Sequence, residues 1–269
     1  MTGHIRGAYR GWADRVYWRL VAGLAPGLLN SHHAYARALA SEVERASQWL
    51  DLGCGHAFLP PFVSPQRLQE ARSRCVSVGI DADGDALAKH RGLRHRVRGN
   101  IERLPFEAGT SDLATANMVV EHVARPEQLF AEIARVLKPG GRLLLHTPNA
   151  DGYTTRLTRL LPDRLLAPIA GTLLGRAAED VYPTYYRANT GAVLTVLLNT
   201  PQWRLERLDH VESSAQFAQV PPAAALELAA IRLFRADRRK HLRACLIVVA
   251  ERRRAETTVQ PCEASRSRY

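Results

Sequence analysis

The fold of this 269-residue chain is decided by the stretch Trp49-Leu-Asp-Leu-Gly-Cys-Gly-His-Ala-Phe58. The apolar run Gln48–Leu52 predicts a short buried strand, and the two glycines after it allow the backbone to turn sharply and approach a ligand closely. Such a loop is weak evidence alone, because tight turns also use glycine. A dinucleotide-binding fingerprint needs a third glycine where Phe58 stands, and no Gly-Lys-Ser/Thr follows to indicate a P-loop. Nucleotide-phosphate binding of either kind is therefore disfavoured.

Strand and helix patterns alternate downstream of this loop. Repeated alternation predicts a parallel sheet with helices on both faces, which is a doubly wound α/β fold. The pattern is looser from Asp151 to Pro183 and regular again afterwards, where Asn189 or Thr190 is expected to cap a helix. The predicted strands are 48–52, 75–80, 96–98, 112–117, 142–146, 203–211 and 242–250, and the predicted helices are 83–90, 125–137, 190–198 and 223–235.

Two helices are predicted before the first strand. The first has an aromatic stripe at helical spacing that includes Tyr9, Trp12 and Tyr17, and the second runs from Ser31 to Arg45. We therefore expect an N-terminal helical attachment over residues 1–46 and a domain over residues 47–250. Within that domain a helical cap is expected at about 151–188, and residues 251–269 are expected to form a disordered basic tail.

The composition, with 46% hydrophobic and 23% charged residues, excludes wholesale disorder. The net charge is +11, but the basic residues are almost all arginine, which we attribute to coding bias and discount as evidence for nucleic-acid binding. Residues 231–269 hold eleven basic and four acidic side chains. This end could face anionic lipid or nucleic acid, although a solvated helix face with a loose tail is the commoner meaning of such a run.

The four cysteines form no Cys-x-x-Cys pair and predict neither a zinc site nor a disulfide framework. The N-terminus lacks the long apolar region of a signal peptide, and no apolar run approaches the roughly 20 residues that span a bilayer. We therefore expect a soluble, cytoplasmic protein without a metal. Peripheral contact with a membrane surface and the oligomeric state stay open.

Polar side chains follow several predicted strands at their carboxyl ends. Asp81 ends the second strand, where a carboxylate can accept two bonds from ribose hydroxyls. Asn100 follows the third strand and can bond an adenine amino group, while Ile101 can lie against the ring. Capping could explain Asp51 or Asp81 singly, but it explains poorly two acids at the ends of adjacent strands beside a glycine turn.

In this order and spacing, residues 48–149 resemble the class I S-adenosylmethionine-dependent methyltransferases, and most closely the small-molecule group that contains the quinone-biosynthesis methyltransferases. Residues 151–250 resemble that family only in their order of elements, although Tyr182–Thr190 is similar to bacterial members. The resemblance implies a seven-stranded, mostly parallel sheet whose last strand is antiparallel. It also implies S-adenosyl-L-methionine as the cofactor.

The resemblance also implies roles for individual residues. Ala57 stands where a third glycine is usual and Asn100 where an aspartate is usual, which puts affinity in doubt more than activity, because an amide oxygen still accepts a hydrogen bond. The implied cofactor contacts are Asp51, Gly53 and Gly55 for the methionine part, Asp81 for the ribose, Ala82, Asn100 and Ile101 for the adenine, and Asn117 and Met118 for the methionine side.

Methyl transfer to a hydroxyl or carbon acid can require a base, and His122 and His146 are the candidates because both follow strands on the cofactor side. Each could equally be a packing or loop residue. The acceptor pocket is expected between the domain, the N-terminal helix and an insertion at residues 153–175, whose leucines share a helical face. Further pocket candidates are Trp12, Tyr185, Tyr186 and Arg187.

The favoured function is therefore methyl transfer to a small apolar or aromatic acceptor such as a quinone, a phenol or a lipid-like metabolite. An RNA or protein methyltransferase is the second hypothesis. It is weakened because Met-Val-Val follows Asn117 in place of the Pro-Pro-Tyr/Phe of base methylation, and because no RNA-binding module is visible. A non-catalytic cofactor-binding or scaffold protein of the same fold is the third.

Overall fold

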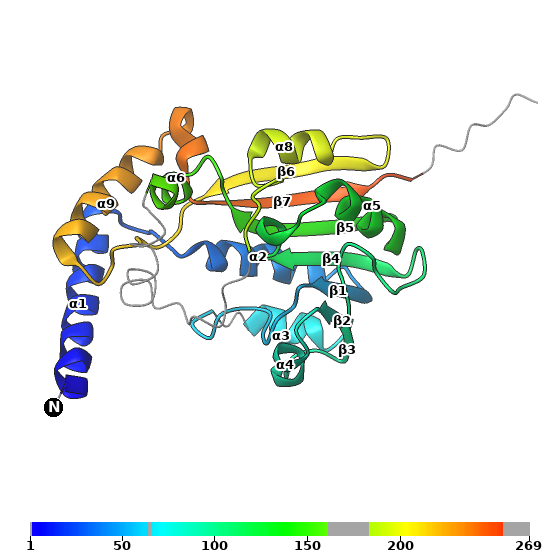
Figure 1. The fold of residues 1–269 in the computed structure, drawn as a ribbon, viewed down its shortest axis with the longest axis horizontal. Helices are drawn as coiled ribbons and strands as arrows, with labels where there is room; N and C mark the ends of the chain where they lie inside the picture. The colour runs from blue at the N-terminus through cyan, green and yellow to red at the C-terminus, as the bar shows by residue number, and fades with distance from the viewer. Residues whose placement is uncertain (1, 64–65, 161–182, 255–269) are drawn as a thin grey trace, which may run out of the picture.

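The computed structural model describes residues 2–63, 66–160 and 183–254, and these form a seven-stranded sheet in the order β3-β2-β1-β4-β5-β7-β6 (Figure 1). Strand β7 runs antiparallel to both of its neighbours, and the other pairs are parallel. The expected doubly wound sheet with an antiparallel last strand is therefore confirmed. The strands are β1 (Gln48–Leu52), β2 (Val76–Asp81), β3 (His95–Arg98), β4 (Ser111–Asn117), β5 (Leu137–Pro148), β6 (Trp203–Val211) and β7 (Cys245–Arg252).

Helices cover both faces of the sheet. One face packs on α5 and α8 through a core that includes Phe130, Ile133 and Leu194, and the other packs on α2, α3 and α4 through Leu39 and Leu68. The helices are α1 (Thr2–Leu24), α2 (Ser31–Val43), α3 (Gln66–Arg72), α4 (Gly84–Lys89), α5 (Pro126–Val136), α6 (Tyr153–Leu160), α8 (Gly191–Leu197) and α9 (Pro221–Phe234), with short 3-10 turns η1 (Val120–His122) and η3 (Asp237–Leu242).

Alternation along β5 decides which side chains meet α2. Leu143 and Leu145 belong to the core on the α5 side, whereas Leu144 belongs to the core on the α2 side. Because successive side chains of a strand point to opposite faces, His146 falls on the α2 face and Thr147 on the α5 face. The two faces of the sheet therefore receive different polar groups at the end of this strand.

Helices α1 and α9 form a separate lobe beyond the carboxyl ends of the parallel strands (Figure 1). Its small core contains Tyr17, Val21, Leu228 and Ile231. Glu227 is buried in this lobe, where its carboxylate accepts hydrogen bonds from the Tyr153 hydroxyl and from two backbone N–H groups. One carboxylate thus joins α6, α9 and the loop between β6 and α9.

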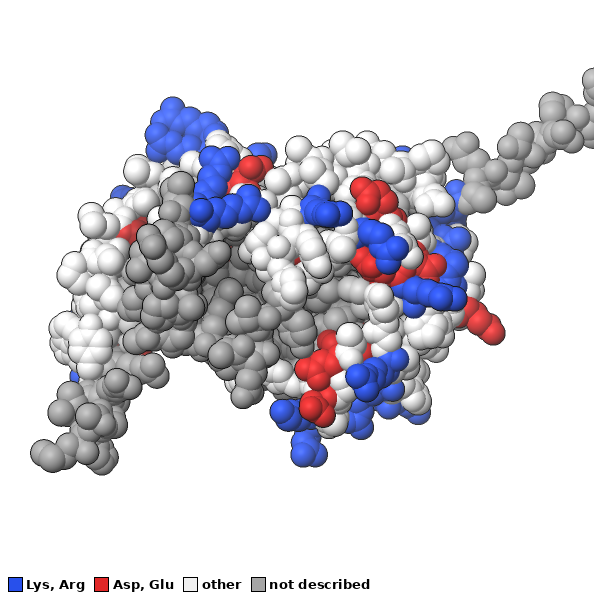
Figure 2. All heavy atoms as spheres, in the orientation of Figure 1, with Lys and Arg blue, Asp and Glu red and all other residues white. Residues whose placement is uncertain are grey.

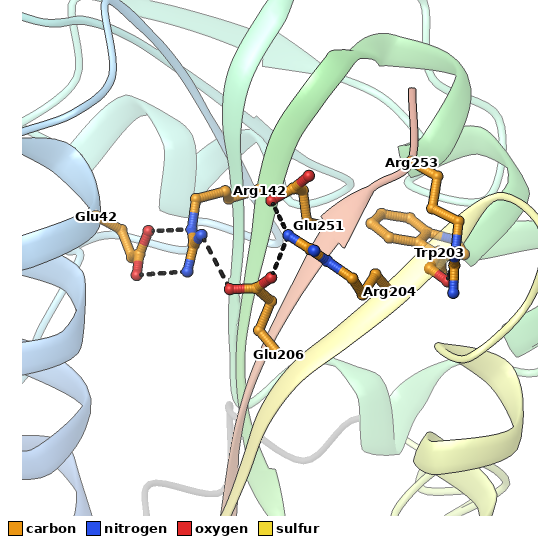
Figure 3. A network of polar contacts seen from close by, with 7 residues as sticks. All are labelled: Glu42, Arg142, Trp203, Arg204, Glu206, Glu251 and Arg253. Carbon is orange, nitrogen blue, oxygen red and sulfur yellow. Dashed lines mark hydrogen bonds and ion pairs between the residues drawn. The ribbon is translucent and has the colours of Figure 1, made fainter. Parts of the chain in front are cut away.

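An ion-pair network lies at the opposite end of the central strands (Figure 3). Arg142 on β5 pairs with Glu42 of α2 at 2.6 Å and with Glu206 of β6 at 3.3 Å. Arg204 then pairs with Glu206 at 2.7 Å and with Glu251 of β7 at 3.0 Å. The network fastens α2 to three strands, and α2 is also the helix that covers the polar end of β5.

Three differences from the expected elements have local causes. Strand β5 begins at Leu137 and not at residue 142 as expected, because the Lys138-Pro-Gly-Gly141 segment belongs to the strand, where the pairing with β4 is irregular between Ser111 and Leu113. Strand β7 begins at Cys245 because η3 occupies the residues before it. Helix α3 was not predicted. Residues 161–182 of the expected cap and residues 255–269 of the expected tail lie outside the described residues.

Across the part of the chain that the structure describes, no helix combines the length and the apolar character that crossing a membrane requires.

Candidate functional site

The turn after β1 uses its two glycines for different reasons. Gly53 and Gly55 both have positive φ angles, 58° and 53°, which residues with a side chain rarely adopt. A Cβ atom on Gly53 would lie 2.6 Å from a methyl carbon of Val119, whereas one on Gly55 would meet nothing within 4 Å. Gly53 is therefore required by packing as well as by conformation, and Gly55 borders space that a ligand can approach.

Phe58 anchors the far end of this turn. Its ring is buried, stacks on Trp49 with the centroids 4.5 Å apart, and lies 4.6 Å from the Arg72 guanidinium. Its carbonyl accepts a hydrogen bond from Nδ2 of Asn117 at 3.2 Å. The position that a dinucleotide fingerprint gives to glycine is thus occupied here by an apolar anchor that also fixes a side chain at the end of β4.

The carboxylate of Asp81 holds the turn from the neighbouring strand. One oxygen accepts the Gly55 N–H at 2.8 Å, and the other accepts the Asp83 N–H at 2.9 Å. Asp83, in contrast, caps α4 by accepting from the N–H groups of Asp85 and Ala86. Because an ionised carboxylate offers about four acceptor positions, Asp81 keeps two for hydroxyl donors.

Asp51 is buried beneath α2 at the end of β1. Its Oδ1 atom accepts a hydrogen bond of 2.5 Å from the Thr115 hydroxyl, which itself accepts from Nε1 of Trp49 at 2.8 Å. Burial raises the pKa of Asp51 to about 7, against the opposing effect of the Thr115 hydrogen bond. A buried carboxylate of this kind is stabilised by a cation, such as an ammonium group, placed beside it.

The residues expected to contact the adenine lie along the edge formed by β2 and β3. Ala82 is exposed, and its carbonyl accepts from Nε of Arg98 at 3.1 Å. Asn100 is exposed too, and its side-chain oxygen accepts the Glu102 N–H at 2.8 Å, so that oxygen already shapes its own loop. Ile101 is half-buried against the core on the α5 side.

The end of β4 is tied to the end of β5 at two points. The N–H of Met118, whose φ is 57°, donates to the carbonyl of His146 at 2.7 Å. The side-chain oxygen of Asn117 lies 2.8 Å from Nδ1 of His146. His146 is fully buried, and burial, together with the neighbouring His32, lowers its pKa well below the ordinary histidine value. The ring is therefore neutral at physiological pH.

The structure adds two residues that sequence reasoning missed, both on α2. The ring of Tyr35 stacks on His146 with the centroids 5.2 Å apart, and the ring of His32 meets it edge-on at 4.9 Å. Phe62 lies farther out, 6.4 Å from His32, and is 61% exposed. The helix itself was predicted, but no sequence spacing indicates that its first turn meets a strand more than one hundred residues later.

His122 and the 183–187 segment are joined to each other. Nδ1 of His122 lies 2.8 Å from the carbonyl of Pro183, and the Tyr185 N–H donates to the carbonyl of Glu121 at 2.7 Å. Arg187 donates to the carbonyl of Ala124 at 2.8 Å. His122 is thus placed in η1 after β4, with its ring against the 183–187 segment.

Two further pocket candidates differ in their surroundings. Tyr186 has a φ of 51°, and the guanidinium of Arg159 lies 5.0 Å from its ring, so it faces α6. Trp12 is 48% exposed on α1, and its described ring neighbour is Tyr9 at 5.7 Å. The described contacts therefore place Trp12 in the α1–α9 lobe and not with the residues at the strand ends.

The chain is similar in sequence to several known proteins. Residues 50–145 match the family described as Methyltransferase domain. The chain is 45% identical over 109 residues to the malonyl-[acyl-carrier protein] O-methyltransferase of a Methylovorus species, covering 38% of this chain and 37% of that protein. It is 36% identical over 124 residues to the demethylmenaquinone methyltransferase of Mycobacterium tuberculosis, covering 42% and 49%. The chain thus spans about half or less of the length of these curated relatives.

A solved structure shares the fold over a longer stretch. The geranyl diphosphate C-methyltransferase of Streptomyces coelicolor superposes with a TM-score of 0.51 at 15% identity, covering 81% of this chain and 77% of that one. This likeness concerns the fold alone. The matched domain over residues 50–145 supports the expected relationship to the class I S-adenosylmethionine-dependent methyltransferases, with S-adenosyl-L-methionine as the cofactor.

Proposed function

We propose that this protein transfers a methyl group from S-adenosyl-L-methionine to a small, apolar or aromatic acceptor. The observation that carries the proposal is the turn after β1, where the Cβ position of Gly55 is open and the adjacent Asp81 keeps unused acceptor capacity. When bound, the cofactor supplies a sulfonium-activated methyl group. The work of the chain is to bind the cofactor, orient the acceptor and exclude water.

The residues at the strand ends fit this cofactor chemically. Asp81 is suited to the ribose hydroxyls because its carboxylate offers acceptors and no donor. Asp51 is suited to the methionine ammonium, since a cation offsets the burial that raises the pKa of this carboxyl group to about 7. The proposed site is completed by the backbone at Gly53 and Gly55, the pair Asn117 and Met118, and the edge residues Ala82, Asn100 and Ile101.

Several features support a small acceptor. Rings of α2 and its surroundings, namely His32, Tyr35 and Phe62, gather beside the end of β5. One relative is named for a quinone substrate, demethylmenaquinone. On the face seen in Figure 2, Lys and Arg gather at the η3 end of α9 and elsewhere lie among acidic side chains. On this face the described basic side chains do not form the continuous basic track that an RNA substrate would need.

Calorimetric titration of the full chain tests the cofactor site. We expect micromolar binding of S-adenosylmethionine and S-adenosylhomocysteine and none of NAD. The Asp81→Ala variant should lose this binding, whereas Asp85→Ala, which removes the same charge from an exposed position four residues later, should keep it. Failure of the folded wild-type protein to bind either ligand would refute the proposal.

A second experiment addresses the acceptor. The protein is incubated with S-adenosylmethionine and panels of quinols, phenols and fatty acyl compounds, with transfer RNA and a basic protein as competing substrate classes, and products are identified by mass spectrometry. Methylation of a small ring compound is expected. Methylation of RNA or protein alone would contradict the acceptor assignment, and cofactor binding without any product would favour a non-catalytic protein.

A further inference from the structure

We propose that Nε2 of His146 and the imidazole of His32 form the polar end of the acceptor site, and that they select an acceptor whose methylated atom is a hydroxyl oxygen. This inference rests on the proposed function and narrows it from methyl transfer in general to O-methylation. It is carried by the hydrogen bonds around His146.

The tautomer of His146 follows from a chain of three groups. The Phe58 carbonyl can only accept, so the atom of Asn117 that faces it at 3.2 Å is the amide nitrogen. The oxygen of Asn117 is then the atom that lies 2.8 Å from Nδ1 of His146. Because an amide oxygen cannot donate, Nδ1 must carry the proton. In a neutral imidazole Nε2 is then an unprotonated acceptor.

This acceptor has nothing to accept from among the described residues. Nε2 of His146 is buried and unpaired there, and so is Nδ1 of the adjoining His32. A buried polar atom without a partner costs about 1–3 kcal/mol, so a ligand group that supplies a hydrogen bond is strongly favoured at such a place. The missing group is a donor, which a hydroxyl provides and a ketone or an ether does not.

The surroundings select against a charged donor. His32 and Tyr35 place ring atoms against His146, and the burial that lowers the pKa of His32 to about 4 disfavours any positive charge at this place, including that of an ammonium group. Asp51, an acid on the same face, interacts with Tyr35 and Thr115. A neutral hydroxyl on a flat or apolar body therefore fits better than an ammonium group.

His32 lies edge-on against the ring that carries this acceptor atom. The His146 ring is 0% exposed, whereas His32 stands in the first turn of α2 with its ring partly accessible and Phe62 beyond it. His32 also offers a route by which a proton leaves His146 towards solvent.

The atoms and charges of the reaction balance with these groups. The acceptor oxygen forms its bond to the methyl carbon as the bond from that carbon to sulfur breaks, and the electron pair of the broken bond stays on sulfur. The hydroxyl proton passes to Nε2 of His146, and its bonding pair stays on oxygen. One positive charge at sulfur is thus replaced by one on the imidazole, and the total is unchanged.

The experiment uses the full chain saturated with S-adenosylhomocysteine and two probes that differ by one donated proton, 2-naphthol and 2-methoxynaphthalene. We expect 2-naphthol to bind about tenfold more tightly, the effect of one hydrogen bond. With histidines labelled by 15N, the Nε2 signal of His146 should report a protonated Nδ1 and should shift on adding 2-naphthol. When S-adenosylmethionine is supplied, the methyl group should appear on oxygen.

Three variants separate this role from a structural one. His146→Phe keeps a ring against Tyr35 and should abolish the preference for 2-naphthol over 2-methoxynaphthalene. Its affinity for S-adenosylhomocysteine should stay within about twofold of the wild-type value. His32→Phe should weaken 2-naphthol binding, and His95→Phe, exposed on β3, should change nothing. Equal binding of the two probes to the wild type, absence of any probe-induced shift, a preference retained in His146→Phe, or methylation at carbon or nitrogen would each overturn the inference. Loss of S-adenosylhomocysteine binding by the wild type would instead remove the proposed function itself.

Discussion

The two glycines of the turn after β1 should fail in different ways when alanine replaces them. Both substitutions place a Cβ atom on a left-handed backbone, which costs about 1–2 kcal/mol each. Gly53→Ala also drives that atom to 2.6 Å from a Val119 methyl carbon, and overpacking of this kind adds about 1–3 kcal/mol. We therefore expect about 2–5 kcal/mol of destabilisation for Gly53→Ala and about 1–2 kcal/mol for Gly55→Ala. The smaller entropy of the unfolded alanine chain applies to both and leaves the difference unchanged.

Cofactor affinity should rank the same two variants in the opposite order. The Cβ atom of Gly55→Ala enters the open space that we assign to the cofactor, whereas that of Gly53→Ala points into the core. Urea unfolding followed by circular dichroism measures the first quantity, and calorimetry with S-adenosylhomocysteine on the folded variants measures the second. We expect at least tenfold weaker binding for Gly55→Ala, which corresponds to about 1.4 kcal/mol. For Gly53→Ala we expect a change below threefold, which is less than about 0.7 kcal/mol.

Removing the obstructing side chain provides the control. Val119→Ala alone leaves a cavity, yet in combination with Gly53→Ala it relieves the close contact, so the double variant should lose less stability than the two single losses combined. Strict additivity, equal destabilisation by the two glycine substitutions, or tight cofactor binding by Gly55→Ala would show that the turn does not work as described.

Three further outcomes follow from buried charges. Burial raises the pKa of Asp51 to about 7, above its unfolded value, so the free energy of unfolding of the cofactor-free protein should fall as pH rises from about 4 to about 7, by at most about 4 kcal/mol. Asp51→Asn should flatten this pH dependence in urea titrations at pH 5 and 8. Glu212→Gln should flatten it in part, because burial raises the pKa of Glu212 to about 7 as well. An unchanged pH dependence in Asp51→Asn would contradict the burial argument. Glu227→Ala leaves one hydroxyl and two backbone N–H groups without their acceptor and should lower the free energy of unfolding by about 2–5 kcal/mol, and Glu227→Gln should lower it less. A loss below about 0.5 kcal/mol in Glu227→Ala would mean that water replaces the carboxylate. A double-mutant cycle on Arg142→Met and Glu42→Gln should give a coupling of about 1 kcal/mol or more, since both groups are largely buried, and a coupling near zero would make this pair an ordinary surface contact.

Much of the sheet could be predicted because each parallel strand has a local signature. Apolar runs that end in a glycine turn or an acid place β1 and β2 to within one residue, and Pro126 marks the start of α5. Thr190, one of two expected caps, accepts from the Val193 N–H and begins α8. Such signals act over a few residues, so they survive without knowledge of the tertiary fold.

The residues of the proposed acceptor site could not be predicted in the same way. His146 was recognised only by its position at the end of a strand, and the tautomer of its ring depends on Asn117 and Phe58 from two other segments. His32 and Tyr35 reach the same ring because α2 crosses the carboxyl end of β5, a contact between residues more than one hundred positions apart. No periodicity in the sequence encodes that crossing.

The packing of Phe58 after the glycine turn determines the hydrogen bonding at the proposed acceptor site. Ala57 and Phe58 follow the two glycines, and Phe58 turns its ring into the core against Trp49. That packing fixes the carbonyl of Phe58, which orients the amide of Asn117, and the amide in turn decides which nitrogen of His146 carries a proton. Glycine in place of Phe58 would remove this packing, which would leave the carbonyl of residue 58 free to move and the tautomer of His146 undetermined. Phe58, which stands where a dinucleotide-binding fingerprint has glycine, is therefore the residue that allows the neighbouring strands to present a defined hydrogen-bond acceptor.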